Sequence, residues 1–163
     1  MPDYMRRLWQ SRLCPALVPA GFYDDFGQIR SVLKTEGLIR INEYARSCPD
    51  GIEGSFCALL HMLASTADSF ALLQQWLAAP EWICLDPESL FYSISAERTL
   101  LLFCEKPDPR PFAERFCETC DALGGSGQLI AARFSDLCAC RVLEEKGTAS
   151  FLRGWRREIL TVH

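Results

Sequence analysis

The chain has 163 residues, 49% of them hydrophobic, and a formal net charge of −4 at pH 7. This length fits one domain, and an apolar content that includes four Trp and ten Phe excludes a disordered chain. The negative charge provides no global field that would attract nucleic acid. We therefore expect no nucleic-acid partner.

The expected cellular compartment depends on two kinds of segment, membrane spans and secretory signals. No run approaches the ~20 consecutive apolar residues that span a bilayer, and no secretory signal is visible near Met1. The nine cysteines are scattered along the chain. We expect a cytoplasmic protein with reduced thiols and no membrane span.

We expect the chain to consist of an N-terminal segment, residues 1–27, and a single domain, residues 28–163. Within the segment, residues 3–13 have partial helical spacing, whereas residues 13–26 contain prolines and glycines and are predicted to be irregular. Residues 28–34 are predicted to form a strand. Residues 38–46 suit a short helix, and the loop at 47–54 contains the turn signal Pro49-Asp50-Gly51.

Two helices are predicted next. Residues 53–64 repeat apolar side chains at helical spacing, and residues 70–77 do the same until Pro80. The polar residues 65–69 between them are typical of a break, in which Asp68 caps the second helix. The apolar faces of the two helices consist of Phe56, Leu59, Leu60, Leu63, Phe70, Leu73, Trp76 and Leu77.

The segment Leu85–Pro107 is predicted to be a central β-hairpin. Asp86-Pro87-Glu88-Ser89 is turn chemistry, because proline fixes its own φ and the Asp carboxylate is free to accept hydrogen bonds from the following amides. Strands are predicted at residues 90–94 and 99–104, and residues 82–85 suit an additional short strand. Because residues 100–103 are apolar on both faces, we expect helices to cover them.

The remainder of the chain is predicted to be helical. One helix carries Phe112, Phe116, Cys120 and Leu123 on one face and ends at the glycines 124–127. Two further helices are predicted at residues 129–145 and 149–160, with a break at Gly147-Thr148. The fold class is therefore α+β, a mostly helical single domain around a central β-hairpin.

The cysteines raise the question of a metal site. Cys117-x-x-Cys120 and Cys138-x-Cys140 resemble zinc-ligand spacing. Cys120, however, shares the apolar face of its helix, and two residues separated by two positions on a helix lie about 200° apart. Buried cysteines behave as small hydrophobic residues, so we assign no metal ligand and no cofactor.

Cysteine catalysis would require a base, and the two histidines are His61 and His163. His163 is the last residue, so only His61 could form a Cys–His pair, and His61 is better explained as a residue at the margin of the apolar face of its helix. The glycines 124–127 precede a helix and could bind an anion, but a helix–helix turn explains them better because no P-loop Lys follows. No sequence motif of a hydrolase, metalloprotease or nucleotide-binding protein occurs.

Two clusters of arginines flank the chain. They would form a basic patch beside Trp155 if the two termini met, but short clusters on an acidic chain are more typical of solvated helix faces. The clusters consist of Arg6, Arg7, Arg12, Arg153, Arg156 and Arg157.

The segment WICLDPESLFYSISAERTLLLFCEKP resembles an uncharacterised domain at the N-terminus of forkhead-associated (FHA) domain proteins in Firmicutes. The matching motifs are the family's "LLDPEYIF" turn and strand at Leu85–Phe91 and its "FCYYP" strand at Phe103–Pro107. VLKTEGLIRINEYA, residues 32–45, is similar to the strand and short helix that precede them. The resemblance covers roughly residues 28–145 and implies a domain without a catalytic signature.

The order of elements is also similar to part of a protein-kinase C-lobe, and to the degenerate kinase-like domain of the type VII secretion pseudokinase component. Phe103-Cys104-Glu105 stands where a kinase has its metal-binding Asp-Phe-Gly, and no His-Arg-Asp precedes the hairpin. Without that Asp, Mg²⁺ and the phosphates have no partner. This similarity implies a pseudokinase-like protein.

We therefore predict a non-catalytic bacterial interaction or scaffold module in signalling or secretion, which binds a protein partner. We assign no catalytic, cofactor-binding or metal-binding residue. The alternative is a thiol-dependent hydrolase that uses a cysteine with His61.

Overall fold

A computed structural model describes residues 1–47, 53–140 and 144–161. In that part of the chain the structure combines helices with two small antiparallel sheets, which confirms the α+β fold class. The helices are α1 (Asp3–Ser11), α2 (Ile41–Ser47), α3 (Glu53–Gln75), α4 (Phe112–Ala122), α5 (Gly125–Cys140) and α6 (Glu145–Thr161), with short 3₁₀ turns η1 (Pro80–Trp82) and η2 (Pro87–Ser89).

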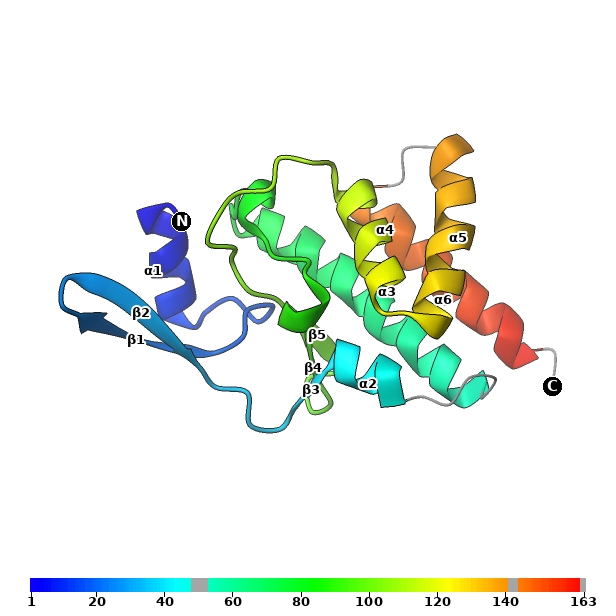
Figure 1. The fold of residues 1–163 in the computed structure, drawn as a ribbon, viewed down its shortest axis with the longest axis horizontal. Helices are drawn as coiled ribbons and strands as arrows, with labels where there is room; N and C mark the ends of the chain where they lie inside the picture. The colour runs from blue at the N-terminus through cyan, green and yellow to red at the C-terminus, as the bar shows by residue number, and fades with distance from the viewer. Residues whose placement is uncertain (48–52, 141–143, 162–163) are drawn as a thin grey trace.

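The long helix α3 is the centre of the helical body. It packs along α6 and contacts β5, and the α4–α5 pair lies beside it (Figure 1). A chain of aromatic contacts joins these helices: the ring centroids are 4.8 Å apart for Phe70 and Phe112, 5.3 Å for Phe112 and Phe116, and 5.5 Å for Phe116 and Phe134. Each of these phenylalanines is buried, so α3, α4 and α5 share one core.

The composition of α3 alone would allow it to cross a membrane. A window of 18 residues within Gly54–Gln75 has a mean hydropathy of 1.5, but 72% of that window is buried inside the protein. The apolar character of α3 is therefore that of the core helix of a globular fold.

The central sheet has the strand order β3-β4-β5, with β3 at Leu38–Arg40, β4 at Phe91–Ser93 and β5 at Arg98–Leu100. The predicted hairpin is confirmed, since β4 and β5 are antiparallel and pair Tyr92 with Thr99. The Asp86 carboxylate accepts a hydrogen bond from the Glu88 amide at 3.1 Å, as the turn chemistry predicts. Leu101 and Phe103 beyond β5 are buried, so helices and the N-terminal residues cover this apolar stretch.

The second sheet is the hairpin of β1 (Ala20–Asp25) and β2 (Gln28–Leu33). It extends away from the helical body at the end of the molecule opposite the C-terminus (Figure 1). Strand β2 confirms the predicted strand, whereas the prediction that residues 13–26 are irregular is wrong for β1. Because β1 pairs with β2, residues on both sides of position 27 belong to one sheet.

Several helix boundaries differ from the predictions. The helix predicted at residues 129–145 is α5, which begins earlier, at Gly125, and ends at Cys140. Residues 53–75 form one helix rather than two, because the polar residues 65–69 bond to β5 instead of interrupting α3. The first residues of the predicted helix 38–46 form β3, since they pair with β4. Helix α6 continues through Gly147-Thr148, where the Thr148 hydroxyl donates to the Glu144 carbonyl and Thr148 is buried. The turn predicted at Pro49-Asp50-Gly51 lies outside the described residues.

Candidate interaction surface

The β1–β2 hairpin turns through Phe26 and Gly27, both of which have positive φ values, 51° and 82°. Two such residues between paired strands match the twist of an antiparallel hairpin. The Asp24 carboxylate accepts a hydrogen bond from the Gly27 amide at 2.6 Å, and Arg30 lies 2.6 Å from the Asp25 carboxylate across the strands. Local polar contacts therefore hold the turn in place without help from the rest of the fold.

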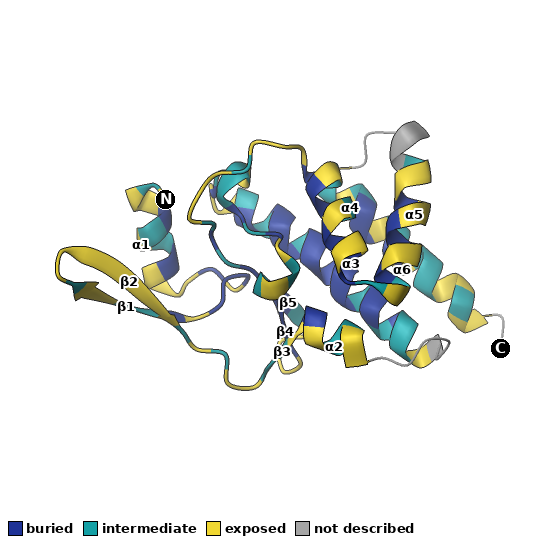
Figure 2. Ribbon diagram, viewed as in Figure 1, coloured by how far each residue is buried: buried dark blue, intermediate teal, exposed yellow. Residues whose placement is uncertain are grey.

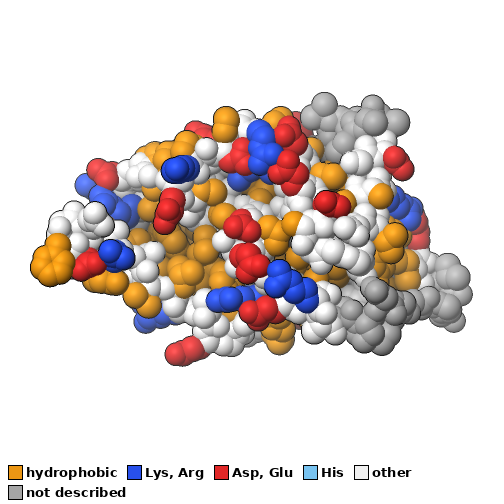
Figure 3. Space-filling view, viewed as in Figure 1, with side chains coloured by type: hydrophobic (Ala, Val, Ile, Leu, Met, Phe, Trp, Pro, Cys, Tyr) orange, Lys and Arg blue, Asp and Glu red, His pale blue; other side chains and the backbone are white. Residues whose placement is uncertain are grey.

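The hairpin exposes large apolar side chains. Phe26 at the tip is fully exposed, and half or more of the surface of Tyr23, Ile29 and Val32 is open to solvent. The strand register places Tyr23 and Val32 on one face of the hairpin and Ile29 on the other, with Phe26 in the turn between the strands. We refer to these four residues as the hairpin patch. Figure 2 shows β2 almost entirely exposed and β1 partly buried, and Figure 3 shows hydrophobic side chains at the tip of the hairpin. Clustered exposed apolar side chains of this kind mark sites of protein–protein interaction.

The base of the hairpin is anchored by α1. The Trp9 ring meets Phe22 of β1 edge-on, with centroids 5.3 Å apart, and meets Phe103 at 5.7 Å. The Trp9 indole N–H donates to the Val18 carbonyl at 2.7 Å. Leu17 forms a parallel bridge with Leu101 just beyond β5. These contacts fix the direction of the hairpin relative to the core.

A groove of about 930 Å³ separates the hairpin from the central part of the chain. Figure 3 shows hydrophobic side chains exposed beside the hairpin on this face of the molecule. Arg6 and Trp9 of α1 line one side, and Cys84 and Cys104 line the opposite side. The hairpin side of the groove is lined by Phe22, Tyr23, Gln28, Ile29, Arg30, Ser31 and Leu33.

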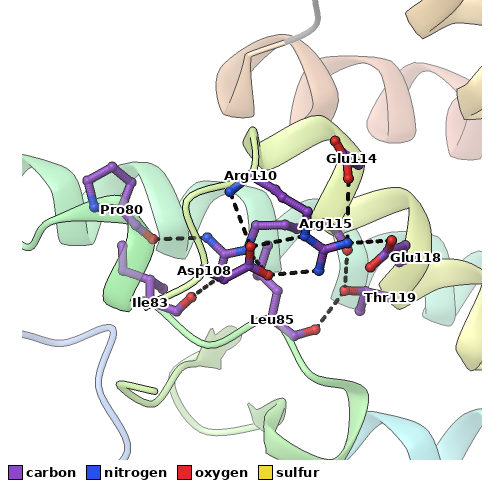
Figure 4. A network of polar contacts seen from close by, with 9 residues as sticks. All are labelled: Pro80, Ile83, Leu85, Asp108, Arg110, Glu114, Arg115, Glu118 and Thr119. Carbon is purple, nitrogen blue, oxygen red and sulfur yellow. Dashed lines mark hydrogen bonds and ion pairs between the residues drawn. The ribbon is translucent and has the colours of Figure 1, made fainter. Parts of the chain in front are cut away.

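A buried arginine of α4 holds the wall of the groove in place (Figure 4). The Arg115 guanidinium donates to the Pro80 carbonyl at 3.0 Å and to the Ile83 carbonyl, and Thr119 donates to the Leu85 carbonyl at 2.6 Å. Arg115 itself is buried, so these carbonyls satisfy its donors. The segment 80–85, which consists of η1 and the residues that follow it, is therefore fastened to α4.

The same network continues to the surface through Asp108 and Arg110. Arg110 donates to the Asp108 carboxylate at 2.8 Å and to Glu118 at 2.5 Å, and Arg115 lies 3.4 Å from Asp108. Hydrogen bonds from Arg110 hold the pKa of Asp108 down at about 2. The proline-rich connection between β5 and α4 is thus tied to the first turns of α4.

His61 lies half-buried on α3 and shares a hydrogen bond with the Tyr92 hydroxyl, 3.0 Å from its Nε2. Burial lowers the pKa of His61, and the positive charges of Arg156 and Arg153 lower it further. Cys57 precedes His61 by one helical turn, but no hydrogen bond between these two side chains occurs among the described residues. The Cys–His pair required by the hydrolase alternative is therefore not assembled in the described part of the chain.

The zinc-like cysteines are only partly described. Cys120 is buried in the core, where burial raises the pKa of its thiol, and the Cys117 sulfur lies 3.3 Å from the Ser135 hydroxyl. The side chains of Cys138 and Cys140 lie outside the described residues, as does His163. In the described ranges, no group of three or more His, Cys, Asp or Glu side chains is arranged to hold a metal ion.

The predicted helix–helix connection is confirmed, but it is shorter than predicted: Leu123 and Gly124 join α4 to α5, and Gly125 to Gly127 form the first turn of α5. Gly124 has a φ of 70°, and a Cβ atom at Gly127 would overlap the Cys120 carbonyl. These glycines therefore allow α4 and α5 to approach closely. The two arginine clusters do not form one patch, since the N-terminus and α6 end on opposite sides of the molecule (Figure 1).

Two features of this region escape sequence reasoning. Strand β1 lacks the alternation of a half-buried strand, and its Phe26-Gly27 turn is not one of the usual Asn-Gly or Asp-Gly pairs. The buried Arg115 is charged, and charged residues are predicted to be exposed. Its position one residue before Phe116, on the buried face of the helix, is the only signal in the sequence.

No family model matches the chain, and no curated protein matches it. Among solved structures, the chain is similar to the cytoplasmic fragment of EssB from Staphylococcus aureus. The two share 12% sequence identity and superpose with a TM-score of 0.52, over 96% of this chain and 90% of the EssB fragment. At this level of sequence identity, the similarity shows that the chain and the EssB fragment have a common fold. The link to FHA-domain proteins stays a prediction.

Proposed function

We propose that the chain is a non-catalytic bacterial interaction module that binds a partner protein through the hairpin patch. The single observation that carries this proposal is the exposure of Tyr23, Phe26, Ile29 and Val32 on a hairpin that is rigidly anchored at its base. Exposed apolar side chains lower solubility unless a partner covers them. A preorganised hairpin also loses little conformational entropy on binding.

The edges of the hairpin offer a second means of recognition. In the described part of the chain, β1 and β2 pair only with each other, so each strand has one edge whose backbone groups are open to a partner. An extended segment of a partner protein can add to such an edge by main-chain hydrogen bonds. The adjacent groove of about 930 Å³ then has room for alternate side chains of the added segment.

The shared fold with the EssB cytoplasmic fragment supports a bacterial and cytoplasmic setting. We further propose that the module is pseudokinase-like and acts in a signalling or secretion assembly. The Phe103-Cys104-Glu105 stretch supports this view, because it has no Asp to bind Mg²⁺. The Cys104 backbone N–H instead donates a hydrogen bond to the Trp82 carbonyl.

A photo-crosslinking amino acid placed at Phe26 tests the proposal in bacterial cells. We expect crosslinks to one partner protein, and none when the same amino acid replaces Leu129, an exposed residue of α5 that serves as the matched control. Equal crosslinking from both positions would contradict a specific surface. Crosslinking to a second copy of this chain would contradict a heterologous partner.

Calorimetry with the purified partner then measures the contribution of the patch. The variant Phe26→Asn keeps a residue that tolerates positive φ, and combined with Val32→Ser it is expected to weaken binding by about tenfold or more. Leu129→Ser should bind like the wild type. Unchanged affinity in the hairpin variant would show that the partner binds elsewhere.

The two catalytic alternatives have their own tests. Saturable, Mg²⁺-dependent binding of ATP with phosphoryl transfer would overturn the non-catalytic assignment. Hydrolase activity that is lost in His61→Ala, together with one fast-reacting thiol, would favour the thiol-dependent hydrolase.

A further inference from the structure

Two cysteines that are 20 positions apart in the sequence meet across an isolated antiparallel bridge. The bridge pairs Ile83 with Phe103, and the flanking hydrogen bonds run from the Cys84 amide to the Leu102 carbonyl and from the Cys104 amide to the Trp82 carbonyl, each 2.8 Å long. Side chains alternate along such a pair. Ile83 and Phe103 enter the core, and both cysteines therefore lie on the opposite side.

The two thiols lie diagonally across the bridge on the same side, and they are reachable from solvent. Both Cys84 and Cys104 are half-buried. Both line the groove of about 930 Å³ beside the hairpin, and both also line a second hollow of about 410 Å³ on the α4 side. A small oxidant can therefore approach the pair through either hollow.

Cys84 has the features of a reactive thiol. The hydrogen bond from Cys104 lowers the pKa of Cys84 to about 6, and the Asp86 amide and the Ser89 hydroxyl lower it further against the effect of burial. Cys104 shows the opposite shift, since the neighbouring Cys84 sulfur and burial raise its pKa. The lowered pKa of Cys84 favours the thiolate form of this cysteine, which is the nucleophilic form.

We propose that Cys84 and Cys104 are a two-thiol oxidation site that reacts with peroxides. The Cys84 thiolate attacks one peroxide oxygen, the O–O bond breaks, and the sulfur becomes a sulfenic acid while hydroxide leaves and takes up a proton. The Cys104 sulfur then attacks the sulfenic sulfur, and its proton leaves with the displaced hydroxyl as water. In sum, two thiols and one hydrogen peroxide yield one disulfide and two waters.

Closing the disulfide changes the groove. The cysteines occupy a diagonal position in the ladder, which is wider than a directly opposed pair, so the bond draws the two segments together. Arg115 and Thr119 hold the carbonyls on either side of Cys84 and keep it in register.

Peptide mapping of the full chain tests the site. The reduced protein is treated with hydrogen peroxide, the remaining thiols are alkylated, and the chain is cut after glutamate. This cleavage places Cys84 in residues 82–88 and Cys104 in residues 98–105, each as the single cysteine of its peptide. We expect these two peptides to appear linked, two hydrogens lighter than their sum, in monomeric protein.

Variants distinguish the roles of the two thiols. Cys84→Ser should leave Cys104 reduced, whereas Cys104→Ser should leave a sulfenic acid on Cys84 that a dimedone probe traps. Cys117→Ser, at another half-buried cysteine, should still form the link. The proposal is overturned if Cys84 stays reduced while other cysteines oxidise, if the link joins two chains, or if Cys104→Ser leaves Cys84 inert. The mapping of the wild type decides the first two points even if a variant fails to fold.

Discussion

The hydroxyl of Ser65 in α3 accepts a hydrogen bond from the backbone N–H of Thr99 in β5, with 2.8 Å between oxygen and nitrogen. Ser69 donates to the Thr99 carbonyl at 2.5 Å, and the Thr99 hydroxyl donates to the Met62 carbonyl at 2.9 Å. All of these groups are buried. Polar side chains of α3 thus complete the hydrogen bonding of Thr99 on the outer edge of the central sheet.

Ser65→Ala is expected to lower the free energy of unfolding by about 1–3 kcal/mol, because it leaves the buried Thr99 N–H without a partner. Urea denaturation followed by circular dichroism measures this change. The control is Ser150→Ala, an exposed serine in α6, which should change stability little. Equal stability of the two variants would mean that the α3–β5 contact contributes nothing.

Arg115→Met is expected to lower the free energy of unfolding by about 3 kcal/mol. The substitution keeps an apolar stem but removes charge-assisted hydrogen bonds to two carbonyls of residues 80–83. The matched control, Arg110→Met, removes an exposed arginine from the same network and should have a small effect. A similar loss in both variants would contradict the special role of the buried arginine.

Gly127→Ala is expected to destabilise the α4–α5 turn by about 1–3 kcal/mol, because the added methyl group would overlap the Cys120 carbonyl and the Leu123 side chain. Gly154→Ala in α6 has open space around the new methyl group and should stabilise that helix by up to about 1 kcal/mol. Thermal melts of the two variants should therefore move in opposite directions. A rise in the melting temperature of Gly127→Ala would refute the close approach.

The stability of the protein should fall as the pH drops through the range in which histidine titrates. Burial lowers the pKa of His61, so below about pH 6.5 the unfolded chain takes up a proton that the folded chain resists. The stabilisation is present above the pKa of the unfolded state and is lost as the pH falls through the lower pKa of the folded state. His61→Gln should lose less stability than the wild type between about pH 7.5 and about pH 5.

Denaturant unfolding of His61→Gln and of the wild type at each pH provides the comparison. The difference between the two proteins isolates the histidine from other groups that titrate in this range. Parallel pH dependence of the two proteins would contradict the contribution of His61.

The alkylation rate of Cys84 by iodoacetamide should rise with a midpoint near pH 6 and level off above about pH 7. An ordinary thiol has its midpoint near pH 8.5. The charged groups around the pair are Asp86, which opposes ionisation of Cys84, and Arg115 and Asp108, which act on Cys104.

Cys104→Ala removes the largest cause of the shift, so the midpoint for Cys84 should move upward in this variant. Mass spectrometry of the peptide that covers residues 82–88 measures the rate at each pH. A midpoint near pH 8.5 in the wild type would contradict the thiol–thiol contact.

Local patterns in the amino-acid sequence were enough to predict some parts of the fold. The apolar period of α4, the turn at Asp86-Pro87 and the apolar stretch from Leu100 to Phe103 depend on neighbouring residues, and the α+β fold class follows from them. These features are readable because helical and strand periods place apolar residues on one face regardless of what that face contacts.

Features that depend on partners far along the chain could be seen only in the folded protein. Ser65 continues a helix instead of breaking it because its hydroxyl bonds to Thr99, 34 positions away. Cys84 meets Cys104, and Arg115 is buried because the carbonyls of residues 80 and 83 receive its donors. The sequence shows which side chains are polar and will need a hydrogen-bond partner if they are buried. Which group becomes that partner depends on how distant segments pack.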